Sequence, residues 1–145
     1  MNPQCTDEIY MLLYHCNFGY PLLSEDTEVT VHGGKITPLG ENSRDPRHMC
    51  EPSPDAKEEL FLCENADSGT VYNRKLGLGV TLSFTTGSLP CLVEWKNMMS
   101  HEYVVALEPC NTYGMNRETI ERTGKIAVLR AGDTAVNELV FKITE

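Results

Sequence analysis

The sequence predicts an all-β protein built as an antiparallel β-sandwich. Short apolar runs recur along the chain, and Gly, Pro, Asn and Asp interrupt them at intervals of about 8–12 residues, as in sandwiches and barrels. Hydrophobic residues make up 41% and charged residues 23% of the composition, which is ordinary for a globular protein and argues against disorder. A chain of 145 residues is long enough for one independent core, so we expect a single domain spanning residues 1–145.

The N-terminal third contains two expected strands and a long loop. Residues 9–15 are an apolar run that ends in polar residues, and residues 28–32 alternate before Gly33 and Gly34 end the strand. Residues 38–55 contain four prolines together with Asn, Ser and Asp, which predicts a loop. Loops of this length in compact domains are often functional, so we expect it to close over a ligand.

The rest of the chain is dominated by strands whose apolar residues occupy every second position. The last of them, residues 137–144, is expected to set Leu139, Phe141 and Ile143 toward the core. The other expected strands are residues 59–64, 70–73, 79–84, 91–97, 103–108 and 125–130.

Helical character is found only in residues 116–122. Asn116 can cap the first turn, and Glu118 and Glu121 place negative charge near its start. The segment is short, so the expected architecture is still a β-protein.

Charge and hydropathy exclude several classes of partner. The net charge is −9 and the longest basic run is Arg74-Lys75, so we expect no nucleic-acid partner and no anionic membrane surface. No segment approaches the ~18 apolar residues of a membrane-spanning helix, and the polar start lacks the features of a signal peptide. The six cysteines are spread through a chain too large to need disulfides, which predicts reduced thiols and a cytoplasmic location.

Three motifs occur in order along the chain and carry a family resemblance. They are Tyr-His-Cys-Asn-Phe-Gly at residues 14–19, Leu-Pro-Cys-Leu-Val-Glu-Trp-Lys-Asn at residues 89–97, and Leu-Glu-Pro at residues 107–109. Together they resemble the galactose mutarotase-like, or aldose 1-epimerase-type, superfamily, and in particular an uncharacterised bacterial branch of it. The resemblance runs through nearly the whole chain.

The resemblance implies the C-terminal half of a galactose mutarotase-like supersandwich that binds a small-molecule sugar. Family members are roughly twice as long, and nothing here matches the Arg and the further His of their N-terminal half. A truncation, a misplaced start, a split gene and a natural half-length protein all fit the sequence. We therefore expect either a homodimer or a chain that pairs with a missing N-terminal half, because half a sandwich exposes strand edges.

The resemblance also implies acid/base chemistry at the anomeric carbon of a sugar, with no metal and no cofactor. Opening a cyclic hemiacetal needs a base for the anomeric hydroxyl proton and an acid for the ring oxygen. The matched motifs make Glu108 the base and His15 the acid, and both groups can be tuned toward the working pH. On the residue pattern alone, an exposed glutamate at a strand end and a structural histidine are the more common explanations of these positions.

Further residues are candidates for holding the sugar. Amide side chains can bind hydroxyl groups, an indole ring can stack on a pyranose or pack in the core, and basic side chains can meet acidic groups or remain solvated. The amide candidates are Asn17, Asn97 and Asn111, and the indole candidate is Trp95. The basic candidates are Lys96 and, in the loop of residues 38–55, Arg47 with its neighbours Arg44 and His48.

Two other kinds of site have little support in the sequence. The histidines and cysteines lack the spacing of known zinc motifs, and no cysteine has the local pattern of a catalytic nucleophile. A sugar-binding module without turnover is the alternative to the enzyme.

Overall fold

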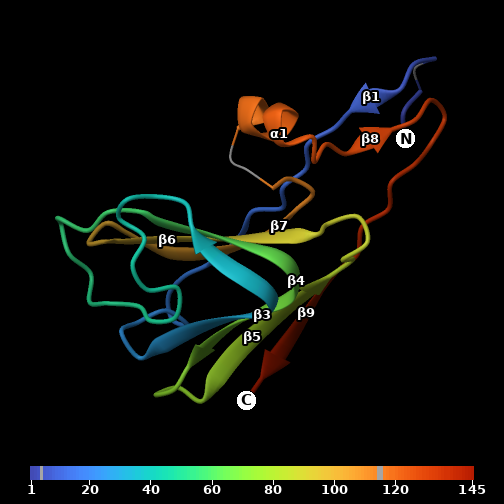
Figure 1. Ribbon diagram of the computed structural model, residues 1–145. Helices are drawn as coiled ribbons and strands as arrows, with labels where there is room; N and C mark the ends of the chain where they lie inside the picture. Colours follow the sequence, from blue (N-terminus) through green and yellow to red (C-terminus); the bar gives the residue numbers. More distant parts are fainter. Residues whose placement is uncertain (4, 114–115) are drawn as a thin grey trace.

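The computed structural model describes residues 1–3, 5–113 and 116–145, and it is dominated by antiparallel strands (Figure 1). A small two-stranded sheet pairs β1 with β8, and the main sheet has the order β2-β7-β6-β4-β5-β9, with β3 paired to β4. The strands are β1 Glu8–Ile9, β2 Cys16–Phe18, β3 Thr27–Pro38, β4 Glu59–Asn73, β5 Leu78–Phe84, β6 Cys91–Met99, β7 Glu102–Cys110, β8 Val128–Leu129 and β9 Leu139–Thr144. The expected all-β sandwich fold is confirmed.

The main sheet folds into two layers because β4 changes partner along its length. Residues 59–64 of β4 pair with β6, whereas residues 68–73 pair with β5. The bend falls at Asn65, which has a φ of 59°, and at a bulge in β3 between His32 and Gly33. As a result β6 and β7 form one layer and β5 and β9 the other (Figure 1).

The glycines at residues 33–34 form this bulge and do not end the strand. Gly33 has a φ of 100°, a backbone conformation that a side chain disfavours. A Cβ on Gly34 would lie 1.6 Å from the carbonyl oxygen of Glu64, so only glycine allows the two strands to approach here. The expectation that the strand stops at Gly33 was therefore wrong, because a bulge lets the ladder continue to Pro38.

The hydrophobic core lies between the two layers. Leu82 from β5, Leu92 from β6 and Leu107 from β7 are completely buried in one cluster. Partly buried side chains of β2 and β9, among them Phe18 and Leu139, pack against this cluster.

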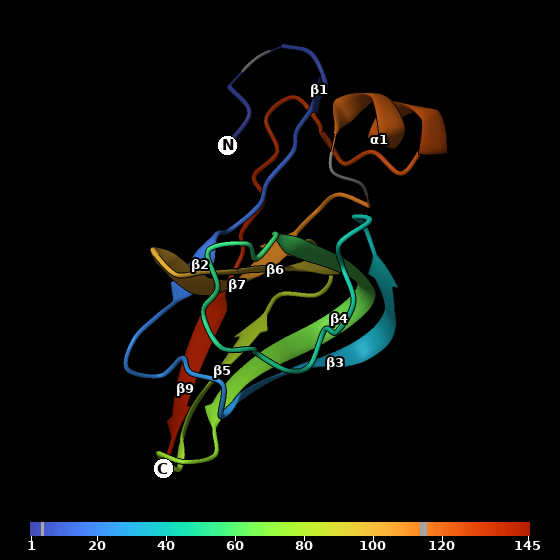
Figure 2. The ribbon, with the colours of Figure 1, turned by 90° about the vertical axis from the view of Figure 1, so that its left-hand side faces the viewer.

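The helix and the β1–β8 pair lie beyond the other side of the β6–β7 layer. Helix α1, Arg117–Thr123, agrees with the expected helix, and both views place it on the side away from β3 and β5 (Figures 1 and 2). No helix in the described part of the chain has the length and apolarity needed to cross a membrane.

Several expected strand boundaries were wrong. Residues 9–15 do not form one strand: β1 ends at Ile9, only an isolated bridge forms at Leu13, and β2 begins at Cys16. The two expected strands at 59–64 and 70–73 are one continuous strand, and the expected strand at 125–130 shrinks to Val128–Leu129. All six cysteines are unpaired in the structure.

Candidate functional site

Strands β2, β6 and β7 bring three motif residues to one face of the sheet. Cys16 pairs with Leu107 and Asn17 with Ala106, so the next position along the antiparallel ladder sets His15 opposite Glu108. On β6, Val93 pairs with Glu108, and Trp95 lies two residues farther along on the same face.

His15 and Glu108 contact each other directly. His15 Nε2 lies 2.8 Å from Glu108 Oε1, a hydrogen-bonding distance. The imidazole side chain is 49% exposed and the carboxylate side chain 5% exposed. One proton can therefore be shared between a buried carboxylate and a ring that faces solvent.

Asn17 and Trp95 fix the orientation of the imidazole. Asn17 Oδ1 lies 2.7 Å from His15 Nδ1 and, as an acceptor, takes a hydrogen bond from the Nδ1–H. The indole of Trp95 meets the His15 ring edge to face, with centroids 5.6 Å apart and planes at 70°. This arrangement leaves Nε2 as the ring atom that exchanges a proton with Glu108.

Burial makes the Glu108 carboxylate a stronger base than an exposed glutamate. Burial raises the pKa of Glu108 above its usual value, and the attraction of His15 opposes the shift. The pKa of the neighbouring Cys16 thiol is also raised, first by burial and then by the charge of Glu108. A buried carboxyl group with a raised pKa next to an imidazole is suited to proton transfer.

Lys96 does not reach this pair, which differs from its expected role in sugar binding. Adjacent strand residues point to opposite faces, so Lys96 lies on the face opposite Trp95, where it is 0% exposed. Its ammonium lies 3.2 Å from Glu59 Oε2 and 3.9 Å from Glu94 Oε1, and 5.4 Å from the centroid of the Phe61 ring. Lys96 is therefore a buried structural cation.

The same cation holds the proline-rich loop (residues 39–58) on that opposite face. Lys96 Nζ donates hydrogen bonds to the carbonyl oxygens of Asp45 and His48, the second at 3.1 Å. Arg47 points away and forms a 3.2 Å ion pair with Glu28. The structure thus does not bring Arg47 to the His15–Glu108 pair, because the loop packs against the face of β6 that carries Lys96 and not the face that carries Trp95.

Asn97 has a local structural role. It is fully buried near the turn between β6 and β7, where Nδ2 donates to Glu102 Oε2 at 3.2 Å and Oδ1 accepts from the Met99 amide at 3.1 Å. These bonds hold the hairpin that carries Trp95 and Glu108.

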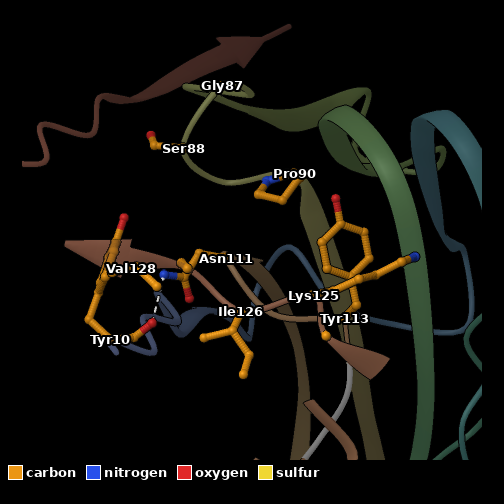
Figure 3. A pocket seen from close by; sticks show the side chains of 11 residues that line it. Tyr10, Gly87, Ser88, Pro90, Asn111, Tyr113, Lys125, Ile126 and Val128 are labelled. Carbon is orange, nitrogen blue, oxygen red and sulfur yellow. Dashed lines mark hydrogen bonds between the residues drawn. The ribbon is translucent and has the colours of Figure 1, made fainter. Parts of the chain in front are cut away.

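Asn111 ties the N-terminal segment to the end of β7. Its Oδ1 accepts from the Leu12 amide at 2.8 Å, and its Nδ2 donates to the Tyr10 carbonyl oxygen at 3.2 Å (Figure 3). The residue lines a separate pocket of about 410 Å³, with Tyr10 and Tyr113 among its walls. Lys125 also lines it, 4.1 Å from the centre of the Tyr113 ring.

The sequence reasoning did not identify Glu94 as an unusual group. Burial raises the pKa of Glu94 to about 8, even though Lys96 opposes the shift. Its Oε1 has no hydrogen-bond partner among the described residues, and Glu59 Oε2 meets Lys96 without hydrogen-bond geometry. The sequence does contain a sign of this buried pair: Glu94 and Lys96 lie between Leu92 and Met98 on one face of the strand, which is otherwise apolar.

The described part of the chain contains no cluster of possible metal ligands. Within residues 1–3, 5–113 and 116–145, no three His, Cys, Asp or Glu side chains come together in a way that could hold a metal ion.

Comparisons with known proteins support the fold. Residues 1–143 match the family described as a domain of unknown function, DUF4432. A Klebsiella pneumoniae protein, provisionally assigned as an aldose 1-epimerase, superimposes with a TM-score of 0.90 at 24% identity. The Slr1438 protein of Synechocystis sp. PCC 6803 superimposes with a TM-score of 0.69 at 14% identity.

These two relatives are much longer than the chain. Each superposition covers 99% of this chain, but only 40% of the Klebsiella chain and 47% of the Synechocystis chain. No curated protein matches the sequence. The expected resemblance to a half-length aldose epimerase-like sandwich is thus confirmed at the level of the fold.

Proposed function

Because this chain belongs to the DUF4432 family and has the fold of an aldose epimerase-like sandwich, we propose that it interconverts the anomers of a small sugar. The observation that carries the proposal is the 2.8 Å contact between His15 Nε2 and Glu108 Oε1. It joins an exposed imidazole to a buried carboxyl group whose pKa is raised by burial.

In the proposed reaction, the sugar inserts between the two groups and replaces their mutual contact. The reaction starts from ionised Glu108 and the imidazolium form of His15. The Glu108 carboxylate takes the proton of the anomeric hydroxyl, whose oxygen becomes the carbonyl oxygen, while the bond from the anomeric carbon to the ring oxygen breaks and the ring oxygen takes the Nε2 proton of the imidazolium. The resulting aldehyde rotates about its bond to C2. The reverse steps then close the ring on the other face and return both protons.

Asn17 and Trp95 support this chemistry by holding the imidazole. The Asn17 contact to Nδ1 keeps the proton in transit on Nε2, and the Trp95 ring limits rotation of the imidazole. Their apolar and amide surfaces, next to the exposed ring, also suit contact with a pyranose.

The test is anomer equilibration followed by NMR or polarimetry on a panel of freshly dissolved aldoses. The wild-type chain should accelerate equilibration of at least one aldose, and Glu108→Gln and His15→Asn should each reduce that rate about 10²–10⁴-fold. The matched controls are Glu58→Gln and His101→Asn, which alter exposed residues outside the site and should leave the rate unchanged. Equal loss in the controls, or full activity in the site variants, would refute these roles.

A sugar-binding module without turnover is the second candidate, and one observation favours it. The Glu108 side chain is only 5% exposed and already bonded to His15, so a sugar must open that contact before it can reach the base. Saturable sugar binding by NMR without any acceleration of anomer exchange would support this candidate over the enzyme.

A further inference from the structure

Beyond Leu139, strand β9 carries apolar residues on a face that the described residues leave exposed. Phe141 pairs with Leu82 and Leu139 pairs with Phe84, so these residues share one face of the sheet. Leu82 is 0% exposed, whereas Phe141 is 53% and Ile143 67% exposed. The expectation that residues 139, 141 and 143 face the core holds only for Leu139, which packs against the core cluster. It was wrong for Phe141 and Ile143, because no described residues form a layer over that part of the face.

The outer edge of β9 is also open. Among the described residues, β9 pairs only with β5. The Glu138 carbonyl accepts from the Thr85 amide at 3.1 Å, so Glu138 uses its backbone toward β5. Alternate residues of an antiparallel strand bond to opposite sides, and the backbone groups of Leu139, Phe141 and Ile143 therefore point to the free edge.

We propose that β9 pairs with β9 of a second copy of this chain, antiparallel and centred on Val140. A two-fold axis at this residue sets Leu139 opposite the partner's Phe141, and both use backbone groups that point to the free edge. Because the axis is perpendicular to the sheet, the inner faces of the two copies join. Each Phe141 side chain then gains an apolar neighbour across the junction.

Charge selects this register over its neighbours. Centring on Val140 sets Glu138 opposite Lys142 of the other copy twice, on the outer face beside the two Val140 side chains. Among the described residues, the Glu138 carboxylate and the Lys142 ammonium form no ion pair and no side-chain hydrogen bond. Centring on Phe141 sets Lys142 opposite Val140, and centring on Lys142 sets two ammonium groups opposite each other, which is unfavourable.

The test is the molecular mass of the native chain in solution, measured by light scattering and sedimentation over a range of concentrations. The wild type should dimerise with rising concentration. Glu138→Lys and Lys142→Glu should each weaken dimerisation about tenfold or more, because both symmetric ion pairs become like-charge pairs. Lys57→Glu, at an exposed loop position, makes the same charge change and should leave the dimer intact.

Recombining the charges gives the decisive measurement. An equimolar mixture of the two single variants should form a heterodimer, because the chain with two lysines then faces the chain with two glutamates. The double variant carrying both substitutions should again form a homodimer. Val140→Lys should dissociate the dimer while leaving the circular dichroism spectrum unchanged, because residue 140 is 51% exposed in the single chain.

Three outcomes would overturn the proposal. The first is a chain that stays monomeric at every concentration, which would leave this edge to other segments such as the additional length of the longer relatives. The second is a dimer that is insensitive to the charge changes. The third is a mixture of the single variants that forms no heterodimer.

Discussion

Replacing Lys96 by methionine separates the two roles that can be assigned to this lysine. The sequence motif suggests a sugar contact, whereas the structure places the ammonium in the interior between Glu59 and Glu94. Methionine keeps an unbranched side chain of similar length and removes only the charge and the hydrogen bonds. We expect Lys96→Met to lower stability while the folded protein keeps the proposed anomer exchange.

The expected loss follows from what the ammonium holds. Without it, Glu59 loses its buried counter-ion and the carbonyl oxygens of Asp45 and His48 lose a charged donor. Removing one partner of a buried ion pair costs roughly 3–5 kcal/mol. Since Tm changes by about 2–4 °C per kcal/mol in a domain of this size, the expected decrease in Tm is roughly 6–20 °C.

Thermal and urea unfolding measured at pH 7 give the change in stability. Limited trypsin digestion adds a local readout, because the loop carbonyls held by Lys96 lie next to Arg44 and Arg47. Cleavage after these arginines should accelerate in Lys96→Met well below its Tm. Lys57→Met, at an exposed position, is the matched control and should change neither Tm nor cleavage.

Two results would contradict this reasoning. An unchanged Tm would show that the buried cation does not stabilise the fold. A Lys96→Met protein that is fully folded but has lost sugar binding would restore the role in sugar recognition that the motif suggests.

Three further variants test other parts of the structure. Glu94→Gln should flatten the pH dependence of the free energy of unfolding. Folding raises the pKa of Glu94 from 4.5 to about 8, so the protonated carboxyl stabilises the fold fully below pH 4.5 and this stabilisation is lost as the pH rises to about 8. Unfolding experiments on the wild type should show a slope of up to ~1.4 kcal/mol per pH unit between these values. Gly34→Ala should destabilise the domain by about 3 kcal/mol, because the new Cβ would lie 1.6 Å from a backbone oxygen of β4, whereas Gly87→Ala, with open space around it, should not. Asn17→Ala should slow anomer exchange about tenfold with little change in Tm, since it removes the acceptor at imidazole Nδ1; equal rates would refute its positioning role.

The strand pattern was predictable wherever one face is apolar and the segment ends at a turn. Residues 79–84 alternate cleanly and become β5, Leu78–Phe84, whose Leu82 and Phe84 are buried. The pattern failed at residues 33–34, because a glycine pair marks a bulge as well as a turn. Only the close approach of Gly34 to Glu64 distinguishes the two.

The proposed acid/base pair illustrates what motif order can and cannot predict. The motifs named His15 and Glu108, and the register of β2 against β7 places them 2.8 Å apart. The motifs could not tell which neighbours share that face. Trp95 and Lys96 are adjacent in sequence, yet the alternation of β6 sends Trp95 to the imidazole and Lys96 into the core.

The proposed dimer and the proposed chemistry can be tested independently, because the dimer is formed by β9 whereas the chemistry is assigned to His15 and Glu108. Tyr14 points inward, where its hydroxyl accepts a hydrogen bond from Asn137 Nδ2 at 3.3 Å just before β9, whereas His15 points outward to Glu108. The contact of this segment to the start of β9 and its contact to Glu108 therefore lie on opposite sides of the strand. We expect Val140→Lys to change anomer exchange by less than about twofold while it abolishes the dimer, and a parallel loss of both would show that β9 acts on the site through the Asn137–Tyr14 bond.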